Sequence, residues 1–130
     1  MRGLILFAHG ARDPRWAEPL NRLCDRVVKA APGTPVAVAF LELMAPDLAT
    51  AADRLVASGC DGISIVPAFL GQGGHVRRDL VNLIASVADR HPRIDIRCAV
   101  AVGEDDSVLD ALAGYCVATL NRDAADTSKP

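Results

Sequence analysis

The sequence predicts an α/β protein in which a four-stranded parallel sheet, with strand order 2-1-3-4, lies between two layers of helices. Short apolar segments of strand length alternate four times with longer segments of helical spacing. Such alternation is typical of βα units, whose strands run parallel and are covered by helices on both faces. Because crossovers between parallel strands are right-handed, four strands leave few arrangements, and we expect the flavodoxin-like one.

The first strand and helix illustrate the pattern. Residues 3–8 are a short apolar run suited to a buried parallel strand. Asp13 and Pro14 match the N-cap and the first position of a helix, which we expect to continue to about Ala31. The apolar stripe of this helix, typical of packing against a core, comprises Trp16, Leu20, Leu23, Val27 and Ala31.

The rest of the chain repeats the alternation. Further strands are predicted at residues 35–41, 63–66 and 94–100. Further helices are predicted at residues 46–58, 75–90 and 107–121, with proline and glycine residues near their ends. Residues 122–130 are polar and are expected to form a C-terminal tail. Residues 1–121 are therefore predicted to form a single domain, as is ordinary for a chain of 130 residues.

The composition argues against several classes of protein. The chain has 14 basic and 16 acidic residues, whereas a nucleic-acid-binding protein usually has a basic excess. No apolar run approaches the roughly 18 residues needed to span a bilayer, and the first residues make a poor signal peptide. We therefore expect a cytoplasmic protein with neither a nucleic-acid partner nor a membrane partner.

The cysteines are consistent with that location. Cys24, Cys60, Cys98 and Cys116 are isolated, without the CxxC pair of a zinc ribbon or a thioredoxin motif. We expect them to be reduced and mostly buried thiols.

Two of the three histidines are predicted to share one edge of the sheet. In an open α/β sheet, ligands bind beyond the carboxyl ends of the strands, where the strand order reverses. That point lies between the first and third strands, and His9 and His75 lie in the loops that follow them. Neutral histidine binds divalent transition metals and also accepts protons near neutral pH. The alternative is that His9 only hydrogen-bonds within its loop and His75 caps a helix.

Residues near these histidines could add contacts to a ligand. Glu42 follows the second strand and could be a metal ligand or a proton acceptor, although a surface carboxylate fits equally well. The loop before the helix at 75–90 lacks the Gly-Lys-Ser/Thr of a P-loop, so we expect no nucleotide. The glycines of this loop are Gly71, Gly73 and Gly74. They could permit close approach of a ligand, or they could simply form a turn. Four arginines lie near the histidines in the sequence: Arg12, Arg15, Arg77 and Arg78. They could bind a ligand with several carboxylates, or they could belong to solvated helix faces.

The aromatic residues are expected mainly in the core or at its rim, as for Trp16, Phe40 and Tyr115. Phe69 is the exception, because it lies in the loop after the third strand. It is therefore a further candidate for contact with a ligand.

Three segments of the chain resemble the small sirohydrochlorin chelatases of the CbiX type. They are residues 6–14 (LFAHGARDP), residues 40–42 (FLE) with Pro46 following, and residues 66–79 (VPAFLGQGGHVRRD). The resemblance covers about residues 3–120. It implies that the chain inserts Co²⁺, Fe²⁺ or Ni²⁺ into sirohydrochlorin, a tetrapyrrole rich in carboxylates, without ATP or another nucleotide.

The resemblance also implies roles for individual residues. The two metal-site histidines of the family match His9 and His75, which would also be the catalytic bases, and its acidic residue after the second strand matches Glu42. Family members usually have Ser where this chain has Ala11. Larger relatives contain two such domains, which implies a homodimer here. Contacts to sirohydrochlorin are expected from Arg12, Phe69, Gly73, Gly74, Arg77 and Arg78.

A second function fits the same residues: a carrier that binds metal or tetrapyrrole without turnover. A histidine phosphatase is less consistent with the sequence, because it would need Arg directly before the histidine, where this chain has Ala8. A flavodoxin-like FMN site would need a Ser/Thr-rich loop after the first strand, which is not present.

Overall fold

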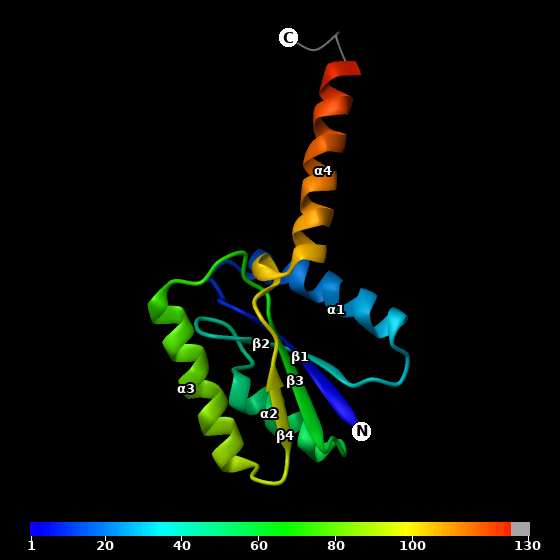
Figure 1. Ribbon diagram of the computed structural model, residues 1–130. Helices are drawn as coiled ribbons and strands as arrows, with labels where there is room; N and C mark the ends of the chain where they lie inside the picture. The colour runs from blue at the N-terminus through cyan, green and yellow to red at the C-terminus, as the bar shows by residue number, and fades with distance from the viewer. Residues whose placement is uncertain (126–130) are drawn as a thin grey trace.

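The computed structural model, which describes residues 1–125, confirms the predicted sheet (Figure 1). The strands lie in the order β2-β1-β3-β4, and all three pairings are parallel. In the register, Leu6 lies between Val38 of β2 and Val66 of β3. The strands are β1 (Arg2–Ala8), β2 (Val36–Phe40), β3 (Gly62–Pro67) and β4 (Asp95–Cys98).

Four α-helices and two short 3₁₀ helices connect and follow the strands. The N-cap residue Asp47 accepts a hydrogen bond from the backbone N–H of Thr50 (2.8 Å), which is why a helix begins directly after it. The 3₁₀ helices are η1 (Pro14–Ala17) and η2 (Val102–Glu104). The α-helices are α1 (Glu18–Ala30), α2 (Leu48–Ala57), α3 (Gly74–Arg90) and α4 (Asp106–Ala125).

One face of the sheet is covered by α2 and α3, which pack against each other as well as against the strands (Figure 1). Alternate residues of β1 and β3 point to this face, as the period of two along a strand requires. Burying these side chains is the main stabilisation of the fold. The largest of them are Ile5, Phe7, Ile63 and Ile65, and they are joined by Leu48 of α2 and Val87 of α3.

The opposite face carries α1, which packs against β2 and β1. Its buried residues are Leu6, Leu20 and Phe40, and partly buried residues such as Leu4 and Val66 pack around them. The β3 and β4 half of this face has no helix packed over it in the described part of the chain (Figure 1). The two faces are therefore covered unequally.

The first helical segment differs from the expectation of one continuous helix. Residues 14–17 form the 3₁₀ helix η1, and the α-helix begins only at Glu18. Pro19 is the reason, because a proline ring is accommodated in the first turn of an α-helix but clashes inside it. The predicted apolar stripe is correct for Leu20, which is buried, and wrong for Trp16, whose exposed fraction is 70%.

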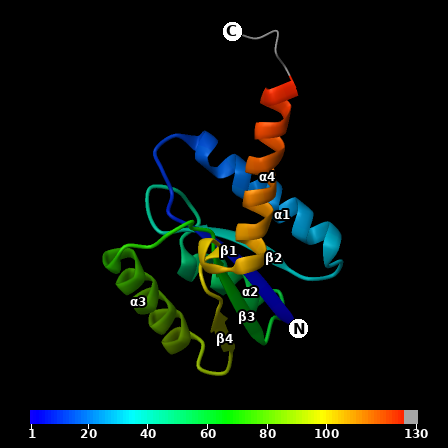
Figure 2. The same cartoon turned by 45° about the horizontal axis from the view of Figure 1, so that its top comes forward.

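The last helix is longer than predicted and leaves the body of the protein (Figures 1 and 2). It includes residues 122–125, which were predicted as part of a tail. Residues 126–130 of that predicted tail lie outside the described residues.

The prediction of buried thiols is correct for Cys60, whereas Cys24 is partly exposed and Cys98 and Cys116 are exposed. None of the four is in a disulfide. Within residues 1–125, no helix combines the length and the apolar character that crossing a membrane requires.

Candidate functional site

The loop after β1 brings His9 and Glu42 together. The Nε2 atom of His9 lies 3.0 Å from Oε1 of Glu42, and both side chains are about half exposed. The backbone holds this contact in place, because the N–H of Leu41 donates to the carbonyl of Ala8 (2.9 Å) and the N–H of Glu42 donates to that of His9 (3.1 Å). The chain after β2 thus continues to pair with the chain after β1. The prediction that these two residues share a site is consistent with this geometry.

Gly10 makes this pairing possible. Its φ is +94°, a conformation that side chains disfavour. A Cβ atom at this position would also lie 1.9 Å from the carbonyl oxygen of Glu42. Only glycine therefore allows the two loops to approach as closely as they do.

Asp13 ends the same loop and begins η1. Its carboxylate accepts a hydrogen bond from the backbone N–H of Arg15 (2.9 Å) and forms an ion pair with the Arg15 guanidinium (2.6 Å). These bonds from Arg15 lower the pKa of Asp13 and raise the pKa of Arg15. The loop is thus tied at its beginning by Glu42 and at its end by Asp13.

The loop after β3 is anchored at its start by Phe69. This ring is only 8% exposed and packs edge-to-face against Phe7, with ring centroids 6.0 Å apart. The carbonyl of Phe69 also accepts a hydrogen bond from the N–H of Gly103 in η2 (3.0 Å). Phe69 is therefore a core residue whose surface also lines a pocket, which limits its contact with a ligand to an edge of the ring.

The glycines later in this loop are unconstrained. A Cβ atom at Gly71, Gly73 or Gly74 would meet nothing within 4 Å, and Gly73 has an ordinary extended conformation with φ −71° and ψ 164°. The internal packing of residues 1–125 therefore does not explain why these positions are glycine.

His75 lies in the first turn of α3 with 86% of its side chain exposed. Its Nε2 atom lies 3.4 Å from Oδ2 of Asp79, one turn further along the helix. Arg77 forms an ion pair with Glu104 of η2 (3.3 Å). Arg12 and Arg78 are exposed and have no ion-pair partner among residues 1–125.

The predicted metal ligands do not form one cluster within a single copy of the chain. Among the described residues, no group of three or more His, Cys, Asp or Glu side chains lies close enough to hold a metal ion. The structure brings His9 to Glu42 but does not add His75 to them. A metal held by all three would require movement of the α3 end of the loop.

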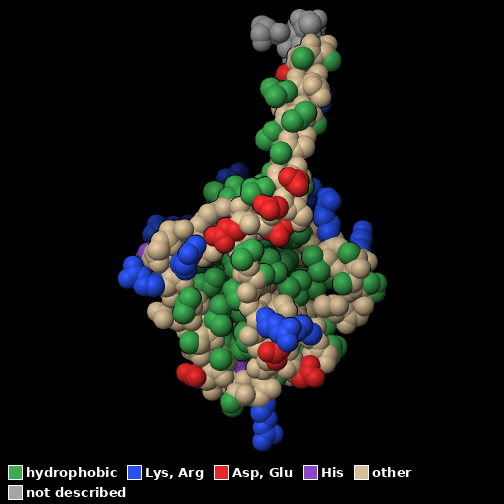
Figure 3. Space-filling view, viewed as in Figure 1, with side chains coloured by type: hydrophobic (Ala, Val, Ile, Leu, Met, Phe, Trp, Pro, Cys, Tyr) green, Lys and Arg blue, Asp and Glu red, His purple; other side chains and the backbone are tan. Residues whose placement is uncertain are grey.

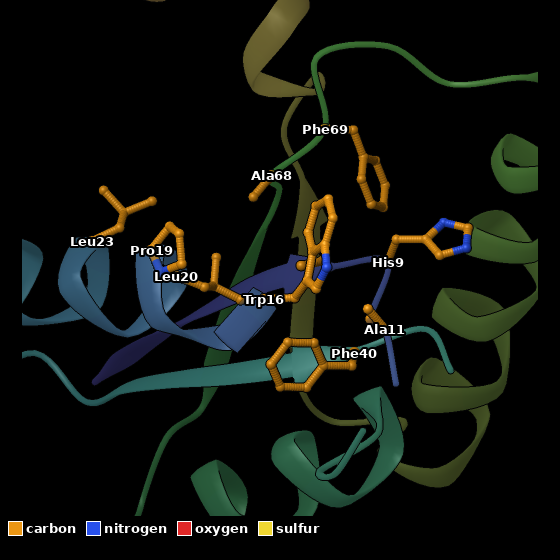
Figure 4. A pocket seen from close by; sticks show the side chains of 11 residues that line it. His9, Ala11, Trp16, Pro19, Leu20, Leu23, Phe40, Ala68 and Phe69 are labelled. Carbon is orange, nitrogen blue, oxygen red and sulfur yellow. The ribbon is translucent and has the colours of Figure 1, made fainter. Parts of the chain in front are cut away.

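An apolar pocket of about 580 Å³ opens beside His9 (Figure 4). The indole of Trp16 stands in it, with His9 and Phe69 on one side and the α1 residues Leu20 and Leu23 on the other (Figure 4). The pocket also includes Ala11, the position where the family usually has Ser. It is the size of a typical ligand pocket and is lined as such pockets are.

Sequence reasoning missed the place of Trp16 in the pocket and the burial of Gln72 in the loop after β3. Trp16 was placed on a buried stripe, and only Pro19, which restarts the helix, signals that it lies outside that stripe. The Oε1 atom of Gln72 is buried without a hydrogen-bond partner among the described residues. No sequence signal indicates that, because it depends on how the loop folds.

Comparisons with known proteins agree with these observations. The model of the CbiX family matches residues 3–115. A sirohydrochlorin cobaltochelatase from Sulfolobus acidocaldarius is 30% identical over 86% of this chain and 87% of its own length. For two relatives of the same name from Methanothermobacter thermautotrophicus and Methanocaldococcus jannaschii, the match spans only 57% and 64% of their length.

Two solved structures show the same fold. A protein named for CbiX and cobalamin biosynthesis, from Marinobacter aquaeolei VT8, is 30% identical with a TM-score of 0.83, over 94% of this chain and 99% of that one. A sirohydrochlorin chelatase from Bacillus subtilis subspecies spizizenii, solved with cobalt, is 29% identical with a TM-score of 0.70. That match covers 87% of this chain but 48% of the Bacillus chain. The match of the family model includes the sheet, the His9 loop and the glycine-rich loop before α3. The chain therefore belongs to the CbiX family.

Proposed function

We propose that the protein is a metal chelatase that inserts a divalent ion, Co²⁺ in the first place and otherwise Fe²⁺ or Ni²⁺, into sirohydrochlorin without ATP. The observation that carries the proposal is the contact between His9 and Glu42 at the rim of an apolar pocket. An imidazole beside a carboxylate can hold a transition metal and can accept a proton. An apolar pocket beside it suits the flat face of a macrocycle.

In this mechanism the metal first binds His9 and Glu42, with His75 as a third ligand. His9 and Glu42 are half exposed, and no closed four-ligand site surrounds them among residues 1–125. Such an open set holds a metal loosely enough for it to leave. His75 lies on the exposed start of α3, so a change in the glycine-rich loop would bring it closer.

The protons are removed by the same groups. Insertion of one divalent ion into the macrocycle displaces two pyrrole N–H protons, and the charge of the tetrapyrrole core is unchanged as a result. The imidazole nitrogens of His9 and His75 accept these protons once the metal has left them for the macrocycle. Glu42 stabilises the protonated form of His9 through the 3.0 Å contact. Solvent then takes the protons from the exposed imidazoles.

The tetrapyrrole is bound by apolar contact and by charge. Trp16 and the edge of Phe69 lie in the pocket, where they can stack against the macrocycle. Arg12 and Arg78, which have no ion-pair partner among residues 1–125, can bind its carboxylates, whereas Arg77 must first exchange Glu104 for a substrate carboxylate. The unconstrained Gly73 and Gly74 let the macrocycle approach the backbone.

We also propose that the working form is a cytoplasmic homodimer. The pocket is partly open in a single copy, so a flat ligand needs a second wall. The match to the Bacillus chelatase covers about half of that chain, which supports pairing of two copies around a twofold axis.

The test is a metal-insertion assay with the purified protein, sirohydrochlorin and each of Co²⁺, Fe²⁺ and Ni²⁺ in turn, followed by the absorption of the tetrapyrrole. We expect insertion well above the rate without protein, fastest with Co²⁺. The carrier alternative predicts binding of metal or tetrapyrrole with no increase in insertion rate. That result with all three metals would refute the chelatase.

A further inference from the structure

The backbone bends sharply directly after Glu42, in the segment between β2 and α2. Leu43 has a φ of +64°, and among residues 1–125 it is the one residue other than glycine with a positive φ. The N–H of Met44 donates a hydrogen bond to the carbonyl of Glu42 (2.8 Å), so residues 42–44 form a γ-turn centred on Leu43. A γ-turn with a positive φ at its centre is the rare and strained form, and it is costly for a bulky residue.

Core packing does not explain a leucine at this position. The side chain of Leu43 is 60% exposed and belongs to neither hydrophobic cluster of the core. Exposure alone is not unusual, because hydrophobic side chains also lie on the surface between β4 and α1 (Figure 3). What distinguishes Leu43 is its backbone, since a glycine would form the same turn without the cost of a Cβ atom. Strained residues of this kind cluster at functional sites.

Hydrogen bonds on both sides of the turn keep Leu43 in this conformation. The N–H of Glu42 donates to the carbonyl of His9 (3.1 Å), which fixes the residue before the turn centre. The N–H of Phe40 donates to the carbonyl of Pro46 (2.9 Å), which closes the loop around it. The turn can therefore relax only if one of these bonds breaks.

The turn determines where the Glu42 side chain begins. The N–H of Glu42 is held by His9, and its carbonyl is held by Met44 and by the close approach of Gly10. From this fixed backbone, Oε1 of Glu42 reaches to 3.0 Å from Nε2 of His9. The carboxylate is about half exposed, and among residues 1–125 it makes no other side-chain hydrogen bond. The backbone turn is therefore the main constraint on its position.

We propose that Leu43 is a positioning residue for the metal site: its strained turn holds the Glu42 carboxylate beside His9, so both ligands are in place before the metal arrives. The inference rests on the proposed function, in which Glu42 and His9 bind the metal. At positive φ a residue with a Cβ atom has few allowed conformations, whereas glycine has many. Leucine therefore keeps the turn, and with it Glu42, in one arrangement. A ligand that is already ordered loses less conformational entropy when the metal binds.

The first experiment measures binding of Co²⁺ without tetrapyrrole, by isothermal titration calorimetry, to L43A and L43G. Both variants lack the leucine side chain, but only L43G lacks the Cβ atom that restricts φ. L43G should bind Co²⁺ about tenfold more weakly than L43A, and L43A should stay within about twofold of the wild type. The Tm of L43G should equal or exceed that of L43A, because the strain is relieved. Equal affinities of the two variants, or a loss of affinity that follows a lower Tm, would refute the proposal.

The second experiment is a double-mutant cycle that tests whether Leu43 acts through Glu42. E42Q keeps the size of the side chain but removes its charge, and should itself weaken Co²⁺ binding about tenfold or more. In the E42Q background, L43A and L43G should bind Co²⁺ equally, because no carboxylate is left to position. A difference that persists there refutes the positioning role. The matched control is the pair L70A and L70G: Leu70 is 71% exposed and its φ is not positive, so the two should bind Co²⁺ alike.

The metal site and the role of Leu43 fail in different ways. If E42Q alone leaves Co²⁺ binding unchanged, Glu42 is not a metal ligand, and both are refuted. If E42Q weakens binding but L43G binds as L43A does, Glu42 remains a ligand and only the positioning role is refuted. The insertion assay separates the same cases, because L43G should have a KM for Co²⁺ about tenfold above that of L43A and the same KM for sirohydrochlorin. Equal KM values for Co²⁺ would refute the positioning role.

Discussion

The loops after β1 and β3 each carry one histidine of the site, but they are held in different ways. His9 is fixed by the Glu42 side chain, by backbone hydrogen bonds to the carbonyl of Ala8 and to its own carbonyl, and by a following glycine with positive φ. His75 is 86% exposed, and the glycines before it meet nothing within 4 Å. One half of the site is therefore formed before any ligand binds, whereas the other half has room to adjust.

This difference indicates that the two loops have different roles in the proposed reaction. A metal is positioned best by a ligand that does not have to be ordered first, which is the case for His9. A tetrapyrrole has to enter and leave, which a loop with free glycines permits. We expect substitutions in the first loop to affect folding and the chemical step, and those in the second loop to affect substrate binding.

The largest effect is expected from the histidines. H9A and H75A should each lower the insertion rate by on the order of a hundredfold or more, because each removes a metal ligand and a base together. Binding of metal-free sirohydrochlorin, measured by quenching of the single tryptophan, should survive in both variants. Wild-type insertion rates in both would contradict the proposed site and favour the carrier.

A pair of glycine substitutions tests the contrast between the loops directly. G10A should lower the free energy of unfolding by about 2–4 kcal/mol, because a Cβ atom there meets the carbonyl of Glu42 and φ is positive. G73A should leave stability nearly unchanged, because its surroundings are empty. Urea denaturation measures both. Equal losses would mean that the second loop is as constrained as the first.

The arginines should separate binding from chemistry. R12A or R78A should weaken binding of sirohydrochlorin about tenfold to a hundredfold, since each removes a charge-assisted hydrogen bond, and the insertion rate at saturation should largely persist. The effect should shrink at high salt, which screens exposed charges. R77A should weaken binding less than R78A, because Arg77 is already paired with Glu104. A loss that is independent of salt would argue against contact with carboxylates.

The smallest expected effect is on stability at low pH, and it concerns Asp13 at the end of the loop after β1. Since Arg15 lowers the pKa of Asp13 from its usual 3.8, the carboxylate stabilises the fold above that pH, and this contribution is lost as the pH falls through the lowered value. NMR titration of Asp13 should show a pKa below 3.8 in the wild type and a return toward 3.8 in R15A. An unchanged pKa in R15A would contradict the contact that closes the loop.

Several features could be predicted from the sequence because they depend on local pattern and on general rules of topology. The alternation of apolar strands with helices, together with right-handed crossovers, leads to the observed strand order. The order in turn brings the ends of β1 and β3 together, so His9 and the loop that leads to His75 were placed at one edge of the sheet. Glu42 followed from its position after the neighbouring β2.

Other features could not be predicted because they depend on contacts between distant segments. Whether the His75 ring meets His9 depends on the path of a loop whose glycines impose no conformation of their own. Trp16 enters the pocket because η1 is separate from α1, and its long apolar side chain would suit a buried stripe equally well.

The sequence by itself determined which residues form strands, the order of those strands and the edge at which the chemistry takes place, because hydrophobic period and chain connectivity act on neighbouring residues. Only the tertiary structure decided that His9 is fixed and His75 is exposed, and that α4 leaves the domain. The direction of α4 is set by the contact between Gly103 and the backbone of Leu70, two residues 33 positions apart in the chain. No local sequence pattern encodes a contact between such distant residues. Because this contact directs α4 away from the sheet, one half of a sheet face stays uncovered.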